Sequence, residues 1–283
     1  MSRDYGEVDV LIFPELALSD RLHTQLIDLV KDEYPGIEAV VAGLNSYKDA
    51  GMDTAESGNY AAITVFSDSA VGSKREAVTS IHEKHHRWCL NRDQITTYGL
   101  GSRLDPSRLW WEDHEIDSRR LTVMAFRERA TAAVLICEDL ARTDPAQELL
   151  RAIGPKLIFA LLMDGPQLTT RWPARYATVL ADDPGSSVLT LTSLALIERT
   201  NASGKHSASY CIGLWRDAGG TTEELKLAPG SHALAISLSQ IAVCEQTLDG
   251  REDASAATWV LSGITPVKCI GPEGPVSPPD WIG

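Results

Sequence analysis

The chain has 283 residues, of which 43% are hydrophobic, enough for one large globular domain or two small ones. Its net charge is −13, which argues against a general nucleic-acid-binding surface because such a surface is normally basic. Five scattered cysteines without a Cys-x-x-Cys pair favour a reduced setting over a disulfide scaffold. We find no signal peptide and no apolar stretch approaching the roughly 18 residues of a membrane span, and therefore expect a soluble cytoplasmic protein.

Strand-like and helix-like segments alternate in the first half of the chain. Val8–Phe13 is a short apolar run bounded by Pro14 and predicts a buried strand. Residues 20–34 carry apolar side chains near helical spacing after a possible cap, Asp20, and predict a helix. Further strands are expected over Ile37–Ala42, Tyr60–Phe66, Leu121–Phe126 and Ala132–Cys137, and a turn over residues 68–75.

The second half of the chain continues the alternation. Helices are expected over Pro145–Ile153 and Arg171–Ala181, strands over Leu157–Met163, Val188–Ser193 and Ala233–Leu238, and a hairpin where Tyr210–Trp215 and Leu225–Leu227 flank Asp217-Ala-Gly-Gly220. The pattern predicts mixed α/β layers. Because no long linker interrupts residues 1–270, we expect one domain there, followed by an extended Pro/Gly-rich tail over 271–283 whose Trp281 and Ile282 are able to dock on a partner.

A cysteine follows the most apolar of these segments. Residues 134–142 read Val-Leu-Ile-Cys-Glu-Asp-Leu-Ala-Arg, so a buried strand would end at Cys137 and present its thiol at the edge of a core. The polar turn that follows would expose backbone N–H groups beside the sulfur, which is the placement that a nucleophile needs. The alternative is a small buried core residue, because free cysteine is among the most buried residue types.

Two other strand-like segments also end at reactive side chains. In residues 8–16 the apolar run ends at a carboxylate, Glu15, within a Phe-Pro-Glu sequence. Lys84, which is followed by His85, comes after the strand-like stretch Tyr60–Phe66. A glutamate, a lysine and a cysteine in this order, with Cys137 in an Ile-Cys-x-Asp context, resemble the nitrilase superfamily of carbon–nitrogen hydrolases over roughly residues 8–240. The resemblance implies a four-layer α-β-β-α sandwich.

The resemblance also implies a division of chemical roles. Cys137 would attack an amide or nitrile carbon to form a thioester, and Glu15 would act as general base. Lys84 would stabilise the oxyanion, with the backbone N–H of Glu138 as a second donor. No cofactor or metal is implied.

Further residues are candidates for the same pocket. Many family members carry a second glutamate between the lysine and the cysteine, and here the sequence leaves Asp93 and Glu112 as alternatives. Trp111, in the pair Trp110-Trp111, either walls a substrate pocket or belongs to a core or interface. Arg171 or Arg175 either holds a substrate carboxylate or phosphate or pairs with Asp182 or Asp183.

The histidines at positions 82, 85 and 86 raise the question of a metal. His82 and His86 form the pattern His-Glu-x-x-His, which binds zinc when it lies on a helix. The segment lacks a sustained helical apolar face and a clear third ligand. We therefore expect no metal site.

One departure from the family bears on both fold and function. Family members usually begin with a strand and helix ahead of the Phe-Pro-Glu strand, and the residues before Glu15 leave no room for them. Either the chain is truncated, or another segment takes their place. We expect Trp259–Val267 or a partner chain to fill the gap, because unpaired backbone groups must be covered.

The alternative function is a weakly active or inactive assembly or sensing module, similar to the nitrilase-like domains associated with bacterial defence reverse transcriptases. Under both, we expect a homodimer or larger homo-oligomer.

Overall fold

The computed structural model describes residues 7–49, 51–68, 75–114, 116, 119–126, 130–246, 248–271 and 274–275. Most of the predicted turn over 68–75 and most of the tail, including Trp281 and Ile282, lie outside the described residues. Within the described ranges, no helix is both long and apolar enough to cross a membrane.

The first sheet carries the N-terminal strands. Its order is β1 (Val10–Leu18), β2 (Ala39–Tyr47), β3 (Glu56–Asp68) and β4 (Arg75–Glu83). β1 and β2 are parallel and the other neighbours are antiparallel. Parallel strands need a crossover, and helix α2 (Asp20–Glu33) supplies it. Ser19 caps this helix by accepting a hydrogen bond from the N–H of Leu22, so the helix predicted over 20–34 is confirmed.

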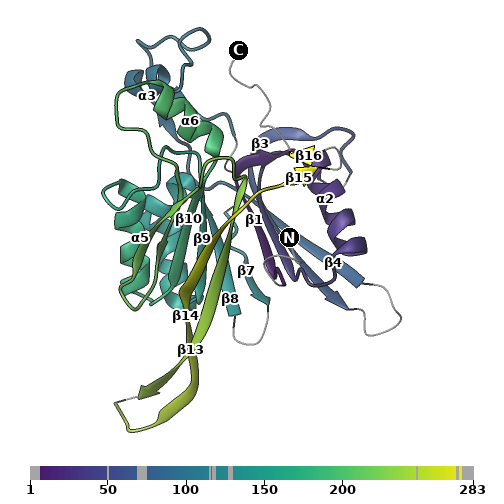
Figure 1. Ribbon diagram of the computed structural model, residues 1–283, viewed down its shortest axis with the longest axis vertical. Helices are drawn as coiled ribbons and strands as arrows, with labels where there is room; N and C mark the ends of the chain where they lie inside the picture. The colour runs from purple at the N-terminus through teal and green to yellow at the C-terminus, as the bar shows by residue number, and fades with distance from the viewer. Residues whose placement is uncertain are drawn as a thin grey trace.

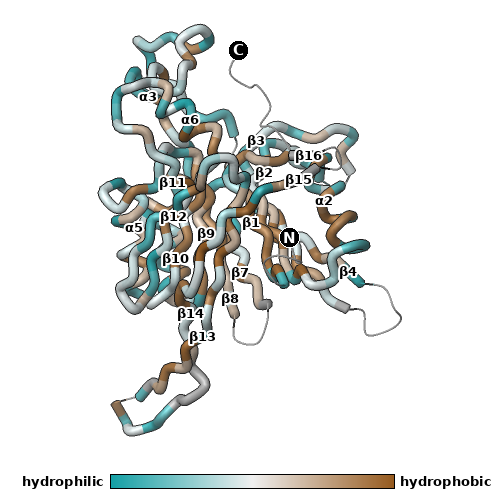
Figure 2. The backbone as a smooth tube through the Cα atoms, viewed as in Figure 1, coloured by the Kyte–Doolittle hydropathy of each residue, from teal (hydrophilic) through white to brown (hydrophobic). Residues whose placement is uncertain are grey.

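The second sheet is larger and more apolar. In spatial order it contains β12 (Thr222–Lys226), β11 (Cys211–Arg216), β10 (Ser187–Thr192), β9 (Leu157–Leu162), β8 (Ala130–Ile136) and β7 (Val123–Phe126). β8, β9 and β10 run parallel to one another. β8 and β9 are buried almost throughout, which explains why they read as apolar runs rather than alternating ones. Figure 2 shows the hydrophobic colouring of this sheet. The hairpin predicted around residues 217–220 joins β11 and β12.

The remaining elements connect or flank the two sheets (Figure 1). They are β5 (Cys89–Leu90), α3 (Arg92–Thr97), β6 (Trp110–Trp111), a 3-10 turn (Cys137–Ala141), a π-helical turn (Thr143–Gln147), α4 (Glu148–Ile153), α5 (Trp172–Asp182), α6 (Leu194–Ala202), β13 (Ala233–Gln246), β14 (Glu252–Val267), β15 (Ile270–Gly271) and β16 (Gly274–Pro275). The alternating element pattern is thus confirmed as a mixed α/β fold.

The two sheets share one core. Val41 of β2 belongs to the same buried cluster as Val134 of β8 and Ile158 of β9. Val40 points the other way and packs with Ile27 of α2. The alternation along β2 therefore places the second sheet on one face of the first sheet and α2 on the other. Helix α5 contributes to the shared core from the side of the second sheet.

The C-terminal strands form a separate hairpin. β14 pairs antiparallel with β13, and the hairpin extends beyond the body of the molecule (Figure 1). Its inner half packs on the shared core through Trp259 and Ile264, and the backbone oxygen of Trp259 accepts a hydrogen bond from Ser187. The prediction that Trp259–Val267 pairs beside the Glu15 strand is therefore wrong. Among the described residues, β1 pairs with β2 alone and lies at the end of its sheet.

Gly43 allows the close approach of β1 and β2. A Cβ at this position would lie 2.5 Å from Cα of Glu15 and 2.8 Å from N of Leu16, and would overlap the carbonyl oxygen of Pro14. We expect Gly43→Ala to lower the free energy of unfolding by about 1–3 kcal/mol, because backbone cannot yield as a side-chain tip does. The check is urea unfolding, with Gly36→Ala as control because a Cβ at Gly36 meets nothing within 4 Å. Equal losses in both variants would contradict the packing described for Gly43.

Candidate active site

Glu15 lies at an irregular point of β1. The register between β1 and β2 shifts between Phe13 and Leu18, and Leu16 has a φ of 57°. This left-handed conformation is rare for a leucine and turns the strand just after Glu15. The glutamate side chain ends up buried, at 5% exposure.

Lys84 follows directly after the last residue of β4. Its backbone N–H donates to the carbonyl oxygen of Asn59 in β3, at 2.8 Å. Its side chain is among the largest fully buried ones, at 1% exposure. A lysine at this depth must be paired, because an isolated buried ammonium is very costly.

Cys137 follows the last residue of β8 and begins the 3-10 turn. It has a φ of 43°, a strained conformation for a residue with a Cβ, and it is 4% exposed. The ends of β8 and β9 lie side by side, since Ile136 pairs with Leu161. Met163, which follows β9, therefore lies close to Cys137, and its backbone N–H lowers the pKa of the thiol.

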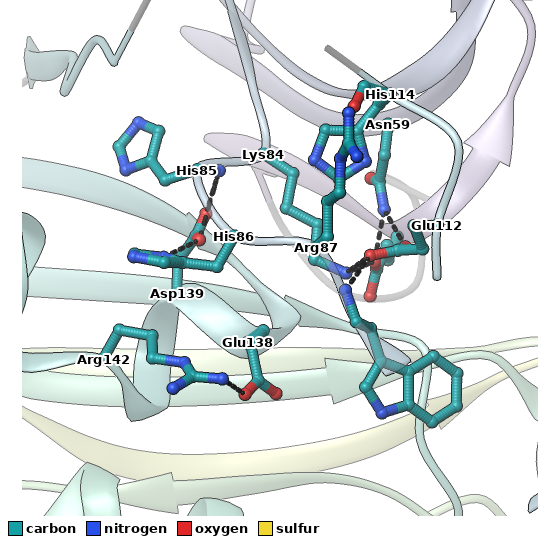
Figure 3. A network of polar contacts seen from close by, with 12 residues as sticks. Asn59, Lys84, His85, His86, Arg87, Glu112, His114, Glu138, Asp139 and Arg142 are labelled. Atoms are coloured by element: carbon teal, nitrogen blue, oxygen red, sulfur yellow. Dashed lines mark hydrogen bonds and ion pairs between the residues drawn. The ribbon is translucent and has the colours of Figure 1, made fainter. Parts of the chain in front are cut away.

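A network of polar contacts surrounds the lysine (Figure 3). Nζ of Lys84 lies 3.3 Å from Oε1 of Glu15 and 2.7 Å from Oε2 of Glu112. Nδ2 of Asn59 donates to the same two carboxylates, at 2.7 Å to Glu15 and 3.1 Å to Glu112. The backbone N–H of Trp88 donates to Glu112 as well, at 2.7 Å. The network joins β1, β3, the turn after β4 and the segment after β6.

The charges in this network depend on one another. Burial alone would lower the pKa of Lys84, but the nearby acidic groups, with Glu15 the strongest, outweigh it and raise the pKa. Burial raises the pKa of Glu15, against the effects of Lys84 and Asn59. The lysine therefore stays protonated at neutral pH, and Glu15 is a carboxyl group with increased basicity.

The thiol of Cys137 is in electrostatic range of the same groups. Burial and the charge of Glu15 raise its pKa well above the usual value, while Lys84 and the N–H of Met163 act in the opposite direction. The resting thiol is therefore protonated at neutral pH, and nucleophilic attack requires a base. The structure brings Glu15 into contact with Lys84, and both groups influence the Cys137 thiol electrostatically.

Of the two candidates for a second carboxylate, only Glu112 reaches Lys84. Glu112 follows the short pairing of β5 with β6, which brings it back to the end of β4. Asp93 is exposed in the first turn of α3, where a carboxylate interacts favourably with the helix dipole. Its position does not fit the predicted role beside the lysine.

The other predicted pocket residues have different surroundings. Trp111 is 60% exposed, so it does not belong to a core. The side chain of Glu138 pairs with Arg142, at 2.7 Å. The predicted role of Glu138 as an oxyanion donor therefore concerns its backbone N–H.

Arg171 pairs with a different acid from those expected. Its Nη2 lies 2.7 Å from Oδ1 of Asp164, just after β9, and the expected pairing with Asp182 or Asp183 is wrong. Those two acids are at the far end of α5, about 16 Å away for an 11-residue helix, and they contact Arg216 and Arg151 instead. A depression of about 360 Å³ includes Arg171 and Arg175 but none of the three reactive residues.

Several residues near the site carried no recognisable sequence signal. Asn59 lies in β3, just ahead of the apolar stretch Tyr60–Phe66, and Tyr98 caps the C-terminal end of the short helix α3. Burial, followed by the charge of Asp164, raises the pKa of Tyr98 to about 12, and the charges of Cys137 and Glu15 contribute as well. Burial also raises the pKa of Asp164. Two residues near the site did carry a signal: Asp139 is the acid of Ile-Cys-x-Asp, and Asp164 begins the turn-like sequence Asp164-Gly-Pro-Gln167.

The His-Glu-x-x-His pattern at residues 82–86 spans the end of a strand and the turn after it, and does not lie on a helix. His82 belongs to β4, whereas His86 lies in the turn after it, so the two imidazoles do not share a helical face. Burial and then His85 lower the pKa of His82 to about 4. The described residues hold no group of three or more His, Cys, Asp or Glu side chains placed for a metal.

No known family profile and no curated protein matches the sequence. Among solved structures, the chain is similar to Nit3 of Saccharomyces cerevisiae, described as a member of branch 10 of the nitrilase superfamily, with 12% identity and a TM-score of 0.47 over 78% of this chain and 73% of that one. It is also similar to glutamine-dependent NAD+ synthetase of Acinetobacter baumannii, with 14% identity and a TM-score of 0.44 over 76% of this chain. This chain spans 36% of the synthetase. At these scores neither similarity identifies a function.

The contact between Glu112 and Lys84 is open to a direct test. We expect Glu112→Gln to lower the free energy of unfolding by about 1–3 kcal/mol, because it leaves a buried ammonium with a single carboxylate. Asp93→Asn, on the exposed helix, should change stability by less than about 0.5 kcal/mol. Chemical denaturation of both variants is the check, and a larger loss in Asp93→Asn would contradict the assignment.

The pKa of Cys137 makes stability depend on pH. Above the ordinary thiol pKa of about 8.5, the unfolded chain loses this proton while the folded chain keeps it, so stability falls as pH rises. We expect wild-type stability to fall more steeply than that of Cys137→Ala between about pH 9 and 10, by up to about 1.4 kcal/mol per pH unit. Cys244→Ala, which removes an exposed thiol, should keep the wild-type dependence. Parallel curves for wild type and Cys137→Ala would contradict the raised pKa.

Proposed function

We propose that the chain is a thiol-dependent hydrolase of carbon–nitrogen bonds, most simply of amides, acting through a thioester on Cys137. The observation that carries the proposal is the contact of the Lys84 ammonium with Glu15 and Glu112, within electrostatic range of the strained Cys137. A buried acid, a fixed cation and a nucleophile on three different elements are the parts that acyl transfer requires.

The proposed acylation begins with proton transfer from the Cys137 thiol to Glu15. The sulfur forms a bond to the carbonyl carbon, and the π electrons move to the oxygen. Lys84 and the backbone N–H of Glu138 stabilise this oxyanion. The tetrahedral intermediate collapses, the C–N bond breaks, and Glu15 gives its proton to the departing amine.

Deacylation uses the same groups a second time. Glu15 takes a proton from water, the resulting oxygen attacks the thioester, and the C–S bond breaks. The sulfur recovers its proton from Glu15 and the carboxylic acid product leaves. Asn59 and Glu112 support the step without reacting, because both contact the network that holds Glu15 or Lys84.

The remaining features of the proposal concern architecture and assembly. Packing of α2 outside the first sheet and of α5 against the second supports the four-layer α-β-β-α arrangement. We further propose that the protein works as a homodimer or larger homo-oligomer. The substrate is a small amide or nitrile, and the choice between these two is part of the test below.

One observation favours a second candidate function. Glu15, Lys84 and Cys137 are all at most 5% exposed, so the reactive groups are closed to solvent. A nitrilase-like module that assembles or senses, with little turnover, would have this property, and bacterial anti-phage defence is one setting for it. The two functions differ in whether the thiol ever receives an acyl group.

A panel of aliphatic and aromatic amides and nitriles tests the proposal. We expect ammonia release from at least one compound and a mass increase on Cys137 that matches its acyl group. Glu15→Gln should slow the reaction by about 100-fold or more, because the resting thiol is protonated. Cys137→Ala is the blank and Cys211→Ala, which removes another buried thiol, is the control that retains turnover.

The result that favours the second candidate is equally specific. If wild type and Cys137→Ala release the same ammonia and no compound adds mass to Cys137, the hydrolase proposal fails.

A further inference from the structure

The turn after Cys137 is joined to the turn that carries Lys84 through one buried carboxylate. Asp139 lies two residues after the cysteine and is 1% exposed. Its two oxygens accept from the backbone N–H of His85, at 3.1 and 3.0 Å, and Oδ1 also lies 2.9 Å from Nδ1 of His86 (Figure 3). His85 is itself held, since its Nε2 lies 3.0 Å from the backbone oxygen of Arg120.

These bonds fix the backbone on the C-terminal side of Lys84. On the N-terminal side, the N–H of Lys84 is held by Asn59 of β3. The lysine is therefore anchored on one side by the first sheet and on the other by the turn that ends β8 of the second sheet. Cys137 begins that same turn, so Asp139 links the backbone next to Lys84 to the backbone next to Cys137.

A neighbouring ion pair on the same turn provides a comparison. Glu138 and Arg142 contact each other at 2.7 Å, with the Arg142 side chain half exposed, and the pair faces away from the lysine (Figure 3). A surface pair of this kind contributes little. The buried Asp139, by contrast, joins two segments that are 54 residues apart in sequence.

We infer that Asp139 is a positioning residue for the proposed hydrolysis, because it holds the Lys84 turn in register with the Cys137 turn through His85 and His86. The inference rests on the proposed function for its chemistry and on these hydrogen bonds for its geometry. Asp139 itself touches neither reacting atom in this assignment; it acts through Lys84.

The test is the pH profile of Cys137 alkylation by iodoacetamide, followed by peptide mass spectrometry and corrected for the folded fraction. Lys84 lowers the pKa of the thiol. If Asp139→Ala lets the lysine move away, the profile should shift to higher pH by about one unit, and the rate at pH 8 should fall about 10-fold. Asp139→Asn keeps one acceptor for the N–H of His85 and should shift the profile less. Arg142→Gln is the matched control and should overlay the wild type.

The outcomes separate this inference from the hydrolase proposal. An Asp139→Ala profile that overlays the wild type, even with a lower melting temperature, would overturn the positioning role, because a purely structural residue changes folded fraction and not the midpoint. If Asp139→Ala does not fold, the same criterion applies to Asp139→Asn. If the midpoint shifts but no amide acylates Cys137, the positioning stands and the hydrolase proposal fails.

Discussion

The site depends on one buried cation held between two carboxylates. The ammonium of Lys84 contacts Glu15 and Glu112 and is removed from water, so its burial is tolerated only while both partners stay in place. Each of the three residues comes from a different part of the chain, and Asn59 bridges the two acids. Loss of either acid leaves the buried ammonium with a single carboxylate, and loss of the lysine leaves two neighbouring acids without their cation. This constraint ties the end of β1, the turn after β4 and the segment after β6 to one another.

Backbone strain and burial are the two further features that bear on the reactivity of the Cys137 thiol. Leu16 and Cys137 both have positive φ values, which cost about 1–3 kcal/mol each and persist only where the surrounding packing imposes them. One follows the predicted base and the other is the predicted nucleophile. Burial keeps the thiol protonated, so its reactivity depends on a neighbouring base and not on a low pKa. In such a dry site the Lys84 charge acts on the sulfur with little screening by solvent.

The sequence alone was sufficient for features that are local. Glu15, Lys84 and Cys137 are candidates on local signals, because each comes at or after a strand-like run, and the structure shows the contact between the first two. Features that depend on long-range pairing were not recognisable. Glu112 and Asp93 could not be separated because the pairing of β5 with β6 places one of them. The sequence also does not predict the pairing of β13 with β14. Each strand is recognisable by itself, but neither strand alone determines its partner or the register of the pair.

The most direct measurement is the position of the Cys137 sulfur in an experimental structure of the protein. We expect Sγ within about 4 Å of a Glu15 oxygen or of Nζ of Lys84, since proton transfer requires hydrogen-bond reach or a single bridging water. A sulfur turned into the apolar layer between the sheets, with both groups beyond about 7 Å, would contradict the proposed convergence of base, cation and nucleophile.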